Sequence, residues 1–256
     1  VLETCAKNGF SVVLFPCNHK EKDLTEKLIE FTKRTNLDGL ILTPPISDMK
    51  ELVRNLQLKI PLCVVSPGLL TSNPLCVSSD DFKATYSMTC HLIKQGHKEI
   101  GFIKGHKDHG ATQHRLDGYL DALSDNNIEI KQENITEGDF SFDSGEIAAK
   151  QLLKKGASKV TAIFASNDAM AAGVLKAAHK AKINIPNDIS LVGFDNSPTA
   201  SQAWPSITTI AQPIKEMASS AAQILIDNIS NKSEKKNVNK VFGSELIFRE
   251  SVKKIN

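Results

Sequence analysis

The fold of this chain is decided by the stretch Val192–Asn196, which reads Val-Gly-Phe-Asp-Asn, and by the run Pro205–Pro213, which reads Pro-Ser-Ile-Thr-Thr-Ile-Ala-Gln-Pro. An apolar run that begins at Ile189 predicts a buried strand, and it ends abruptly in a carboxylate and an amide. The second, β-branched run brings Gln212 to its own end. Ligands of parallel α/β sheets bind beyond the carboxyl ends of the strands. Hydrogen-bonding side chains in that place suit an uncharged polyhydroxy ligand better than a reacting group.

Short apolar runs alternate with helical patterns along almost the whole chain. The apolar runs are continuous rather than alternating, which is typical of strands buried on both faces in a parallel sheet. The sequence therefore predicts an α/β fold of doubly wound parallel sheets. Predicted strands are Ser11–Phe15, Gly39–Thr43, Leu62–Ser66, Ile100–Lys104, Ile135–Glu137, Thr161–Ala165, Ile189–Phe194 and Ile207–Ala211. Predicted helices are Leu24–Thr35, Met49–Leu56, Phe82–Gln95, Thr112–Asp125, Phe142–Lys155, Asp168–Lys182 and Ile214–Ile229.

The two ends of the chain also carry signals. Val1–Asn8 is predicted to be the end of a helix that Gly9 stops, because glycine favours this position. Val241–Glu250 is predicted to be an extended segment that pairs with an earlier strand. The stretch Lys232–Lys240 contains four lysines among Asn and Ser, and we interpret it as a solvated linker rather than a phosphate-binding patch.

Composition indicates a soluble globular protein in a reducing compartment. The net charge is +2, with 41% hydrophobic and 23% charged residues, which does not indicate a dedicated nucleic-acid surface. The five cysteines form no C-x-x-C pair. Neither a signal peptide nor an apolar run near 18 residues is present, so we expect a cytoplasmic protein without a membrane span.

Arg115 is the first candidate for a ligand contact. The chain has four arginines among 31 basic residues, and the forked guanidinium can span two neighbouring hydroxyls or a carboxylate. The alternative is a surface helix residue paired with Asp117 or Asp121. Asp195 is the second candidate, because a carboxylate at a buried strand end needs donors that sugar hydroxyls supply. Its alternative is a residue that stabilises the following turn.

Composition and spacing alone suggest three further candidate residues and one group to be weighed as a metal site. Asn167 and Asp168 follow a predicted strand and open a helix, so either can cap it; we assign Asn167 to the ligand and Asp168 to the cap. Phe140 lies in a polar stretch, where stacking on a sugar or a base would explain an aromatic ring. His106, Asp108, His109 and His114 lack a completing ligand for a metal site, and we expect neither a metal nor a cofactor.

Several blocks follow one another along the chain: Leu37–Leu42, Asp80-Asp81, His91–Ile100, Arg115–Tyr119, Glu137–Phe140, Ala165–Ala171 and Glu245–Ser251. In this order these blocks resemble the effector-binding core of the lactose/purine repressor family, over about Gly9 to Ser251. The resemblance implies a fold like that of periplasmic binding proteins, with two similar α/β subdomains joined by three crossing strands and the effector in the cleft between them. It implies subdomains of residues 1–103 plus 213–232 and 104–212 plus 233–256.

Partners also follow from the resemblance. Members of the family are homodimers, some tetramers, whose N-terminal helix-turn-helix binds an operator. No helix-turn-helix precedes Val1 and the family's first strand is missing, so we expect a truncated regulatory core that does not itself recognise operator DNA. We expect a dimer interface at the helix that opens at Asp168 and at Trp204, because that helix is apolar over a wide arc and needs a second partner. The alternative is a core helix whose apolar faces are all covered within the same chain. The interface residues expected are Met170, Val174, Leu175 and Trp204.

The resemblance also implies which positions of this sequence match ligand-contacting positions of the family. The resemblance supports ligand contacts by Arg115, Asn167, Asp195 and Phe140. It adds Gln212 as a further ligand contact. By analogy it also adds Thr43 and Ser66, which end two predicted strands. Many relatives carry Asp then Arg where this chain has Ser66-Pro67, so the ligand itself is not carried over. Asp80 and Asp81 are expected to cap the following helix.

These observations predict the ligand-sensing core of a transcriptional repressor whose effector is a mono- or disaccharide rather than a purine. Two alternatives remain open: a transport-type sugar-binding protein, and a sugar or nucleoside hydrolase on a related scaffold. Against an enzyme, the sequence has no G-x-S-x-G, no phosphate-binding loop and no G-x-G-x-x-G.

Overall fold

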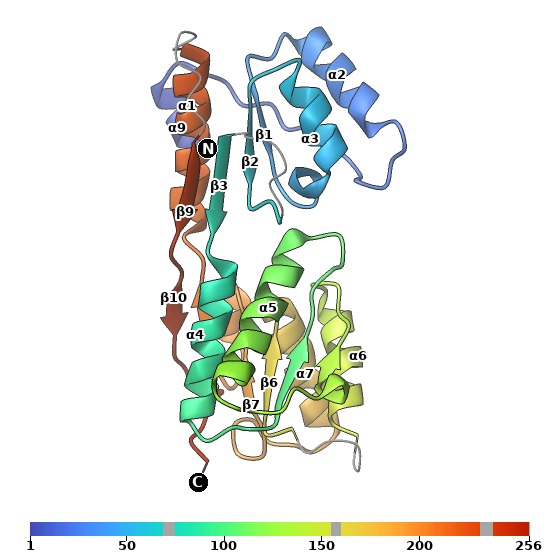
Figure 1. Cartoon of the computed structure of the whole chain (residues 1–256), viewed down its shortest axis with the longest axis vertical. Helices are drawn as coiled ribbons and strands as arrows, with labels where there is room; N and C mark the ends of the chain where they lie inside the picture. The colour runs from blue at the N-terminus through green and yellow to red at the C-terminus, as the bar shows by residue number, and fades with distance from the viewer. Residues whose placement is uncertain (69–74, 155–159, 231–237, 256) are drawn as a thin grey trace. The chain divides into compact units, whose positions relative to one another are not determined.

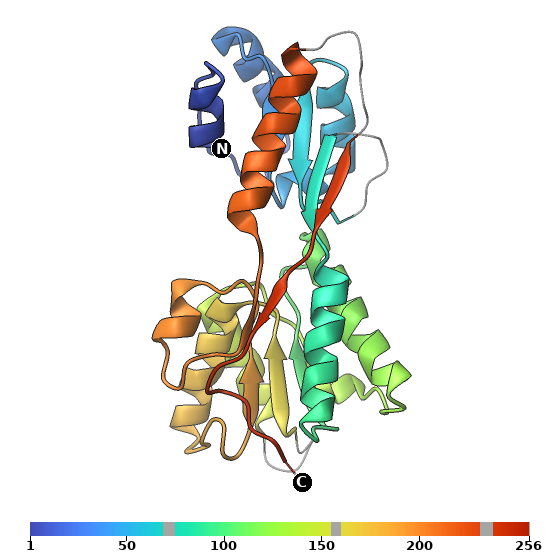
Figure 2. The same ribbon diagram turned by 90° about the vertical axis from the view of Figure 1, so that its left-hand side faces the viewer.

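The computed structural model describes residues 1–68, 75–154, 160–230 and 238–255. The chain divides into two compact units (Figures 1 and 2). Unit 1 comprises Val1–Ser79, Asp108–Gly110 and Pro213–Phe242, and unit 2 comprises Asp80–Lys107, Ala111–Gln212 and Gly243–Asn256.

Unit 1 is built on a parallel sheet with the strand order β1-β2-β3-β9. Its apolar residues alternate between two cores, one on each face of the sheet. Helices α2 and α3 cover the core that contains Leu42 and Val64, and α9 covers the core that contains Cys63 and Val77. The elements are α1 (Leu2–Lys7), α2 (Leu24–Thr35), β1 (Leu40–Leu42), α3 (Lys50–Gln57), β2 (Leu62–Val65), β3 (Leu75–Ser79), α9 (Ile214–Ser230) and β9 (Asn239–Phe242).

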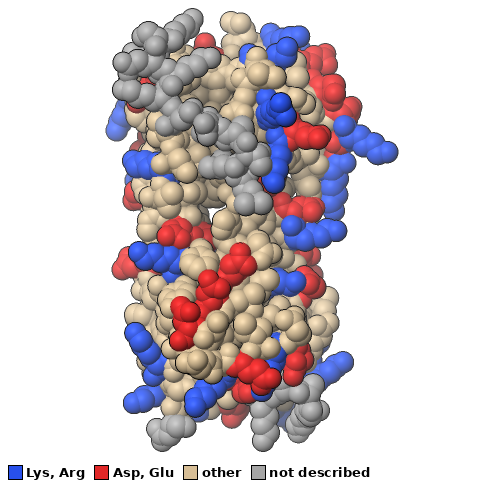
Figure 3. All heavy atoms as spheres, in the orientation of Figure 1, with Lys and Arg blue, Asp and Glu red and all other residues tan. Residues whose placement is uncertain are grey.

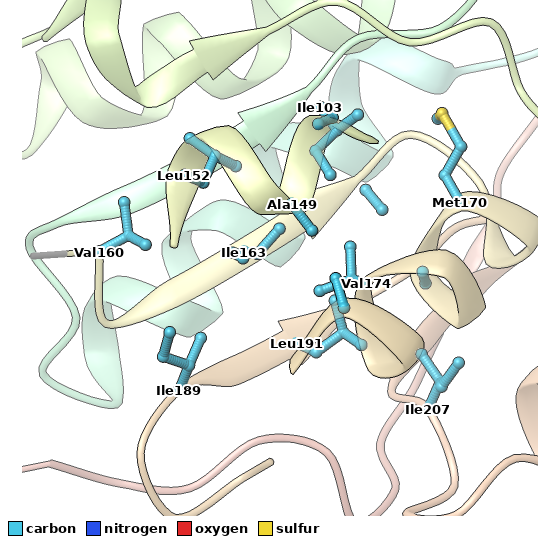
Figure 4. Close-up of a cluster of buried hydrophobic side chains, with 14 of the residues drawn as sticks. Ile103, Ala149, Leu152, Val160, Ile163, Met170, Val174, Ile189, Leu191 and Ile207 are labelled. Atoms are coloured by element: carbon cyan, nitrogen blue, oxygen red, sulfur yellow. The ribbon is translucent and has the colours of Figure 1, made fainter. Parts of the chain in front are cut away.

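Unit 2 is built on a parallel sheet with the strand order β5-β4-β6-β7. Helices α6 and α7 cover one face, where Ile163 and Leu191 lie in the core shown in Figure 4. Helices α4 and α5 cover the other face around Phe102 and Phe164. The elements are α4 (Asp81–Lys94), β4 (Ile100–Ile103), α5 (Gly110–Asp125), β5 (Ile135–Thr136), α6 (Phe142–Leu152), β6 (Ala162–Ala165), α7 (Asp168–Lys180), β7 (Ser190–Val192) and α8 (Pro198–Gln202).

A two-stranded antiparallel ladder also belongs to unit 2. In it β8 (Thr209–Ala211) pairs with β10 (Glu245–Ile247). Single bridges join Val192 to Thr208 and Asp195 to Ala211. The end of β8 therefore lies beside the residues that follow β7, which places Gln212 near Asp195.

The predicted α/β fold with parallel sheets is confirmed. Every predicted helix is present, although Lys155 lies outside the described residues, and seven of the eight predicted strands form. Ser11–Phe15 forms no strand, and Val13 and Leu14 in it are exposed. Strand β3 and the short helix α8 were not predicted, and β9 begins two residues before the extended segment predicted from Val241.

The predictions for the chain ends are also confirmed. Helix α1 ends before Gly9, whose φ is +76°. In the predicted extended segment, β9 pairs with β3 and β10 pairs with β8. Residues 232–237 of the expected linker lie outside the described residues.

Three segments fall in the other unit from the one expected, the shortest being Asp108–Gly110, which belongs to unit 1. Residues 80–103 belong to unit 2, because β4 pairs with β6 and α4 packs on the same core. Asn239–Phe242 belongs to unit 1, because β9 extends the sheet at β3. Among the described residues, no helix has the length and apolar character that a bilayer span requires.

Candidate functional site

Polar side chains from four elements meet where the strands of unit 2 end. We call this group the strand-end cluster; it comprises Asp81 at the start of α4, Arg115 on α5, Asp195 after β7 and Gln212 after β8. Because β6 and β7 are parallel neighbours and Asp195 is bridged to Ala211, the segments after these strands share one edge.

Arg115 is buried and its guanidinium is already hydrogen-bonded within the protein. Its Nε donates to Oδ2 of Asp81 at 2.9 Å, and Nη1 donates to the carbonyl of Ser166 at 2.5 Å. Nη2 lies 3.9 Å from Oδ1 of Asp195. The side chains of Arg115 and Asp81 are only 6% and 9% exposed. The alternative partners Asp117 and Asp121 are therefore wrong, and Asp81 neutralises this guanidinium.

Aromatic rings fix the guanidinium plane. Its carbon lies 3.6 Å from the ring centroid of the fully buried Phe194 and 5.7 Å from that of Phe140. Phe140 has a left-handed φ of +70°, which is strained for a bulky residue. A side chain at Gly105 would run into the Phe140 ring. Phe140 thus lies near Arg115 and is half-buried.

Asp195 supplies the partly exposed carboxylate of the cluster. Its φ is +108°, a conformation that non-glycine residues rarely adopt and that often marks functional sites. The Nε2 of Gln212 donates to Oδ1 of Asp195 at 2.7 Å, and 32% of the Asp195 side chain is exposed. Loss of water around the carboxyl raises the pKa of Asp195 to about 6; nearby Arg115 opposes this rise, and the carboxylates of Asp168 and Asp81 add to it.

The cap of α7 is Asn167 and not Asp168, so the assignment of the cap was wrong; the assignment of Asn167 to the ligand stays a prediction. Asn167 is the N-cap of α7, since its Oδ1 accepts from the amide of Met170 at 2.9 Å, while its Nδ2 donates to the carbonyl of Phe140. Asp168 is buried and accepts from Thr209 Oγ1 at 2.6 Å and from the amide of Ser197 at 2.7 Å. Asn167 thus connects the cap of α7 to the Phe140 backbone.

Helix capping at α4 separates Asp80 from Asp81. Asp80 is the N-cap, because its side chain accepts from the amide of Lys83 at 3.0 Å. Asp81 was expected to cap as well, and it instead pairs with Arg115.

Thr43 and Ser66 lie on unit 1, after the adjacent parallel strands β1 and β2. They therefore share the carboxyl edge of the unit 1 sheet. Thr43 is exposed, and Ser66 is half-buried with a φ of +46°. The amide of Ser66 donates to the carbonyl of Val77 at 2.8 Å.

The residues expected at a dimer interface fall into two groups. Met170 and Val174 have no exposed surface and lie in the core of unit 2 (Figure 4), so their assignment to an interface is wrong. The wide apolar arc of α7 is covered by α6 in the same chain, and close approach at Gly145 brings the two helices together. Leu175 is half-buried, and Trp204 is 88% exposed.

Sequence reasoning missed Asp81, Ser166 and Phe194. The burial of Phe194 was predicted with its strand, but its contact with Arg115 carries no local signal. Within the described part of the chain, no three His, Cys, Asp or Glu side chains are grouped in a way that could hold a metal ion.

Comparisons with known proteins agree with this architecture. A family model described as a periplasmic binding protein-like domain matches residues 89–252. The HTH-type transcriptional repressor PurR of Vibrio vulnificus (strain CMCP6) is 32% identical over 260 residues, which cover 98% of this chain and 75% of the relative.

Two solved structures are also similar. A complex of the transcriptional regulator CelR with cellobiose has a TM-score of 0.88 and 28% identity, covering 98% of this chain and 76% of that one. A LacI family transcriptional regulator from Enterococcus faecium with bound ribose has a TM-score of 0.84 and 26% identity, covering 99% of this chain and 91% of that one. The relatives named here are transcriptional regulators.

Proposed function

The chain belongs to the lactose/purine repressor family, and we propose that it senses an uncharged sugar through the strand-end cluster of unit 2. It is the ligand-sensing domain of a transcriptional regulator. Its function is to convert effector binding into a change of affinity for operator DNA, which requires an effector with different affinities for the two states of the regulator.

The observation that carries the sugar proposal is the environment of Asp195. This carboxylate is partly exposed at a strand end and is held in a strained backbone conformation, while the guanidinium beside it is bonded to Asp81 and to the carbonyl of Ser166. The groups that this edge offers to a ligand are therefore mainly hydrogen-bond acceptors, namely the carboxylate oxygens of Asp195. Sugar hydroxyls are donors that can bind to such acceptors. The cellobiose and ribose bound to two similar regulators support this choice.

We propose that the protein is not an enzyme. The contacts of Asp195 described above are a hydrogen bond from Gln212 and the guanidinium of Arg115 at 3.9 Å, and neither group takes up or releases a proton near neutral pH. Neither of these two contacts therefore supplies Asp195 with a partner acid or base for catalysis. We also propose that neither a metal nor another cofactor takes part.

Operator binding is proposed to come from a helix-turn-helix, which these 256 residues do not contain. In Figure 3 acidic side chains gather in a diagonal band on unit 2, and basic side chains lie scattered over the face shown, which favours effector sensing over DNA contact for that face. Because operator DNA is the proposed partner, we place the protein in the cytoplasm.

A homodimer is proposed through exposed apolar side chains of α6, α7 and the loop after α8. Trp204 is 88% exposed, Ile147 59% and Phe142 38%, and Leu175 lies half-buried on the same pair of packed helices. Exposed apolar groups of this kind mark interaction surfaces, and two-fold contacts are the commonest among homo-oligomers.

Sedimentation tests the dimer. The parent is expected to sediment as a dimer at about 50 μM, within the range of ordinary homodimer affinities, and Trp204→Arg as a monomer. Leu58→Arg is the matched control, because Leu58 is 77% exposed on unit 1. A monomeric parent refutes the dimer, and so does a dimeric Trp204→Arg variant.

A thermal-shift screen tests the effector class. Ribose, glucose, cellobiose and the nucleobases would be tested against the parent and against Gln212→Ala. A ligand at about 100 times its Kd stabilises the protein by about 2.7 kcal/mol, so a bound sugar is expected to raise the Tm by several degrees. Gln212→Ala is expected to reduce that shift, because Asp195 loses its donor. A shift with a nucleobase and none with any sugar contradicts the proposal.

A further inference from the structure

The strand-end cluster holds more negative than positive charge. Asp81 and Asp195 both lie beside the single guanidinium of Arg115. The carboxylate of Asp168 also acts on Asp195 electrostatically and has its own donors, Thr209 and Ser197. Three carboxylates thus share a region in which Arg115 contacts Asp81 and Asp195, while Arg249 acts electrostatically on Asp168.

Asp81 rather than Asp195 is the main counterion of Arg115. The Nε of Arg115 is 2.9 Å from Asp81 and its Nη2 is 3.9 Å from Asp195, so the first contact is a hydrogen bond and the second is longer. Without the charge of Asp81, the guanidinium would be balanced by Asp195 alone. Arginine is well suited to bind phosphate and carboxylate, so this guanidinium would become available to an anionic ligand.

We propose that Asp81 sets the charge selectivity of the site: by neutralising Arg115 it makes the site accept uncharged, hydroxyl-rich ligands and reject their phosphorylated forms. This inference rests on the proposed function, because it concerns the same effector site. It makes Asp81 a positioning and specificity-determining residue that acts through Arg115.

The chain offers a matched control next to this residue. Asp80 and Asp81 are adjacent and both are at the start of α4, but Asp80 caps the helix whereas Asp81 contacts Arg115. Asn caps helices as well as Asp does, so Asp80→Asn removes the same charge and keeps the cap. Asp81→Asn retains an oxygen that can accept from Arg115 and removes only its charge.

Calorimetric titrations with two pairs of probes test the proposal: glucose with glucose 6-phosphate, and ribose with ribose 5-phosphate. The readout is the ratio of the Kd of the phosphate to the Kd of the neutral sugar, which a merely structural role of Asp81 would not change. The parent is expected to bind a neutral sugar at least about tenfold more tightly than its phosphate. Asp81→Asn is expected to lower the ratio by about tenfold or more, as for removal of a unit charge some 7 Å from an anion in an effective dielectric of about 20. Asp80→Asn is expected to keep the ratio of the parent.

The outcomes separate this inference from the proposed function. An unchanged ratio in a folded Asp81→Asn variant overturns the role of Asp81, and so does an equal change in Asp80→Asn. A parent that binds the phosphate as tightly as the sugar overturns the inference even if Asp81→Asn does not fold, while sensing of a sugar would stand. A parent that binds none of the four probes and gave no sugar shift in the wider screen overturns the proposed function and this inference with it.

Discussion

Replacing Asp195 by Asn is expected to stabilise the ligand-free protein at neutral pH. The carboxyl has a pKa raised from 3.8 to about 6, mainly because the fold removes water from it. Ionising it therefore costs more in the folded than in the unfolded state. Asparagine keeps an oxygen that accepts from Gln212 and carries no charge, so it avoids this cost.

The size of the effect follows from the shift. A rise from 3.8 to about 6 corresponds to about 3 kcal/mol when the carboxyl is fully ionised. Since 32% of the side chain is exposed, solvent screening reduces the expected value to about 1–2 kcal/mol. Below about pH 3 the carboxyl is protonated in both states and the cost vanishes; the cost is still small at pH 4, grows between about pH 4 and 6 and is nearly complete at pH 7.5.

Urea unfolding at pH 4 and at pH 7.5 measures this difference. Asp195→Asn is expected to nearly match the parent at pH 4 and to exceed it by about 1–2 kcal/mol at pH 7.5, equivalent to a Tm higher by several degrees. Asp121→Asn makes the same chemical change on the exposed surface of α5 and is the control. A less stable Asp195→Asn at pH 7.5, or a gain that is independent of pH, would refute the reasoning.

Two further predictions concern buried groups. Arg115→Ala should lower the free energy of unfolding by about 3–5 kcal/mol, because it leaves the buried Asp81 carboxylate without its counterion; urea unfolding would contradict this with a loss below about 1 kcal/mol. Among the cysteines, the exposed Cys17 should react with a thiol reagent in the native protein, whereas Cys63 and Cys76 should react only after unfolding. Burial raises the pKa of Cys63 to about 12 and that of Cys76 to about 11, and mass spectrometry that finds either labelled as fast as Cys17 would contradict this.

The elements of the fold were predictable because their signals are local. The apolar spacing of α2 gives its observed range Leu24–Thr35, and apolar runs give seven strands. Ser11–Phe15 has the composition of a strand, but a strand also requires a paired neighbour, which its own sequence does not reveal. The wide apolar arc of α7 correctly predicted a second partner for that helix, but the partner is α6 in the same unit.

The sequence predicted most residues of the strand-end cluster, but it did not predict which of them contact one another. Arg115, Asp195 and Gln212 were expected at this edge and lie together. The true partner of Arg115 is Asp81, which lies 34 residues away in the sequence. No local sequence pattern indicates a pairing over that separation. The alternative Asp117 could have been rejected from helix geometry alone, because side chains two positions apart do not face each other.

Similar reasoning explains why the cap of α7 was assigned to Asp168 although Asn167 forms it. Asn167 and Asp168 are equally good caps by residue type. The choice between them depends on Thr209 and Ser197, which come from distant segments and give Asp168 its donors.

Titration of a neutral sugar into the parent and Asp195→Asn tests the central claim most directly, namely that the Asp195 carboxylate receives hydroxyl groups of an uncharged effector. The sugar that gives the largest thermal shift would be used at pH 7.5, where the carboxyl is ionised. The account predicts that Asp195→Asn stays folded and binds about 10–100-fold more weakly, the range for losing hydrogen bonds to a charged group. Equal Kd values for the two proteins would contradict the account.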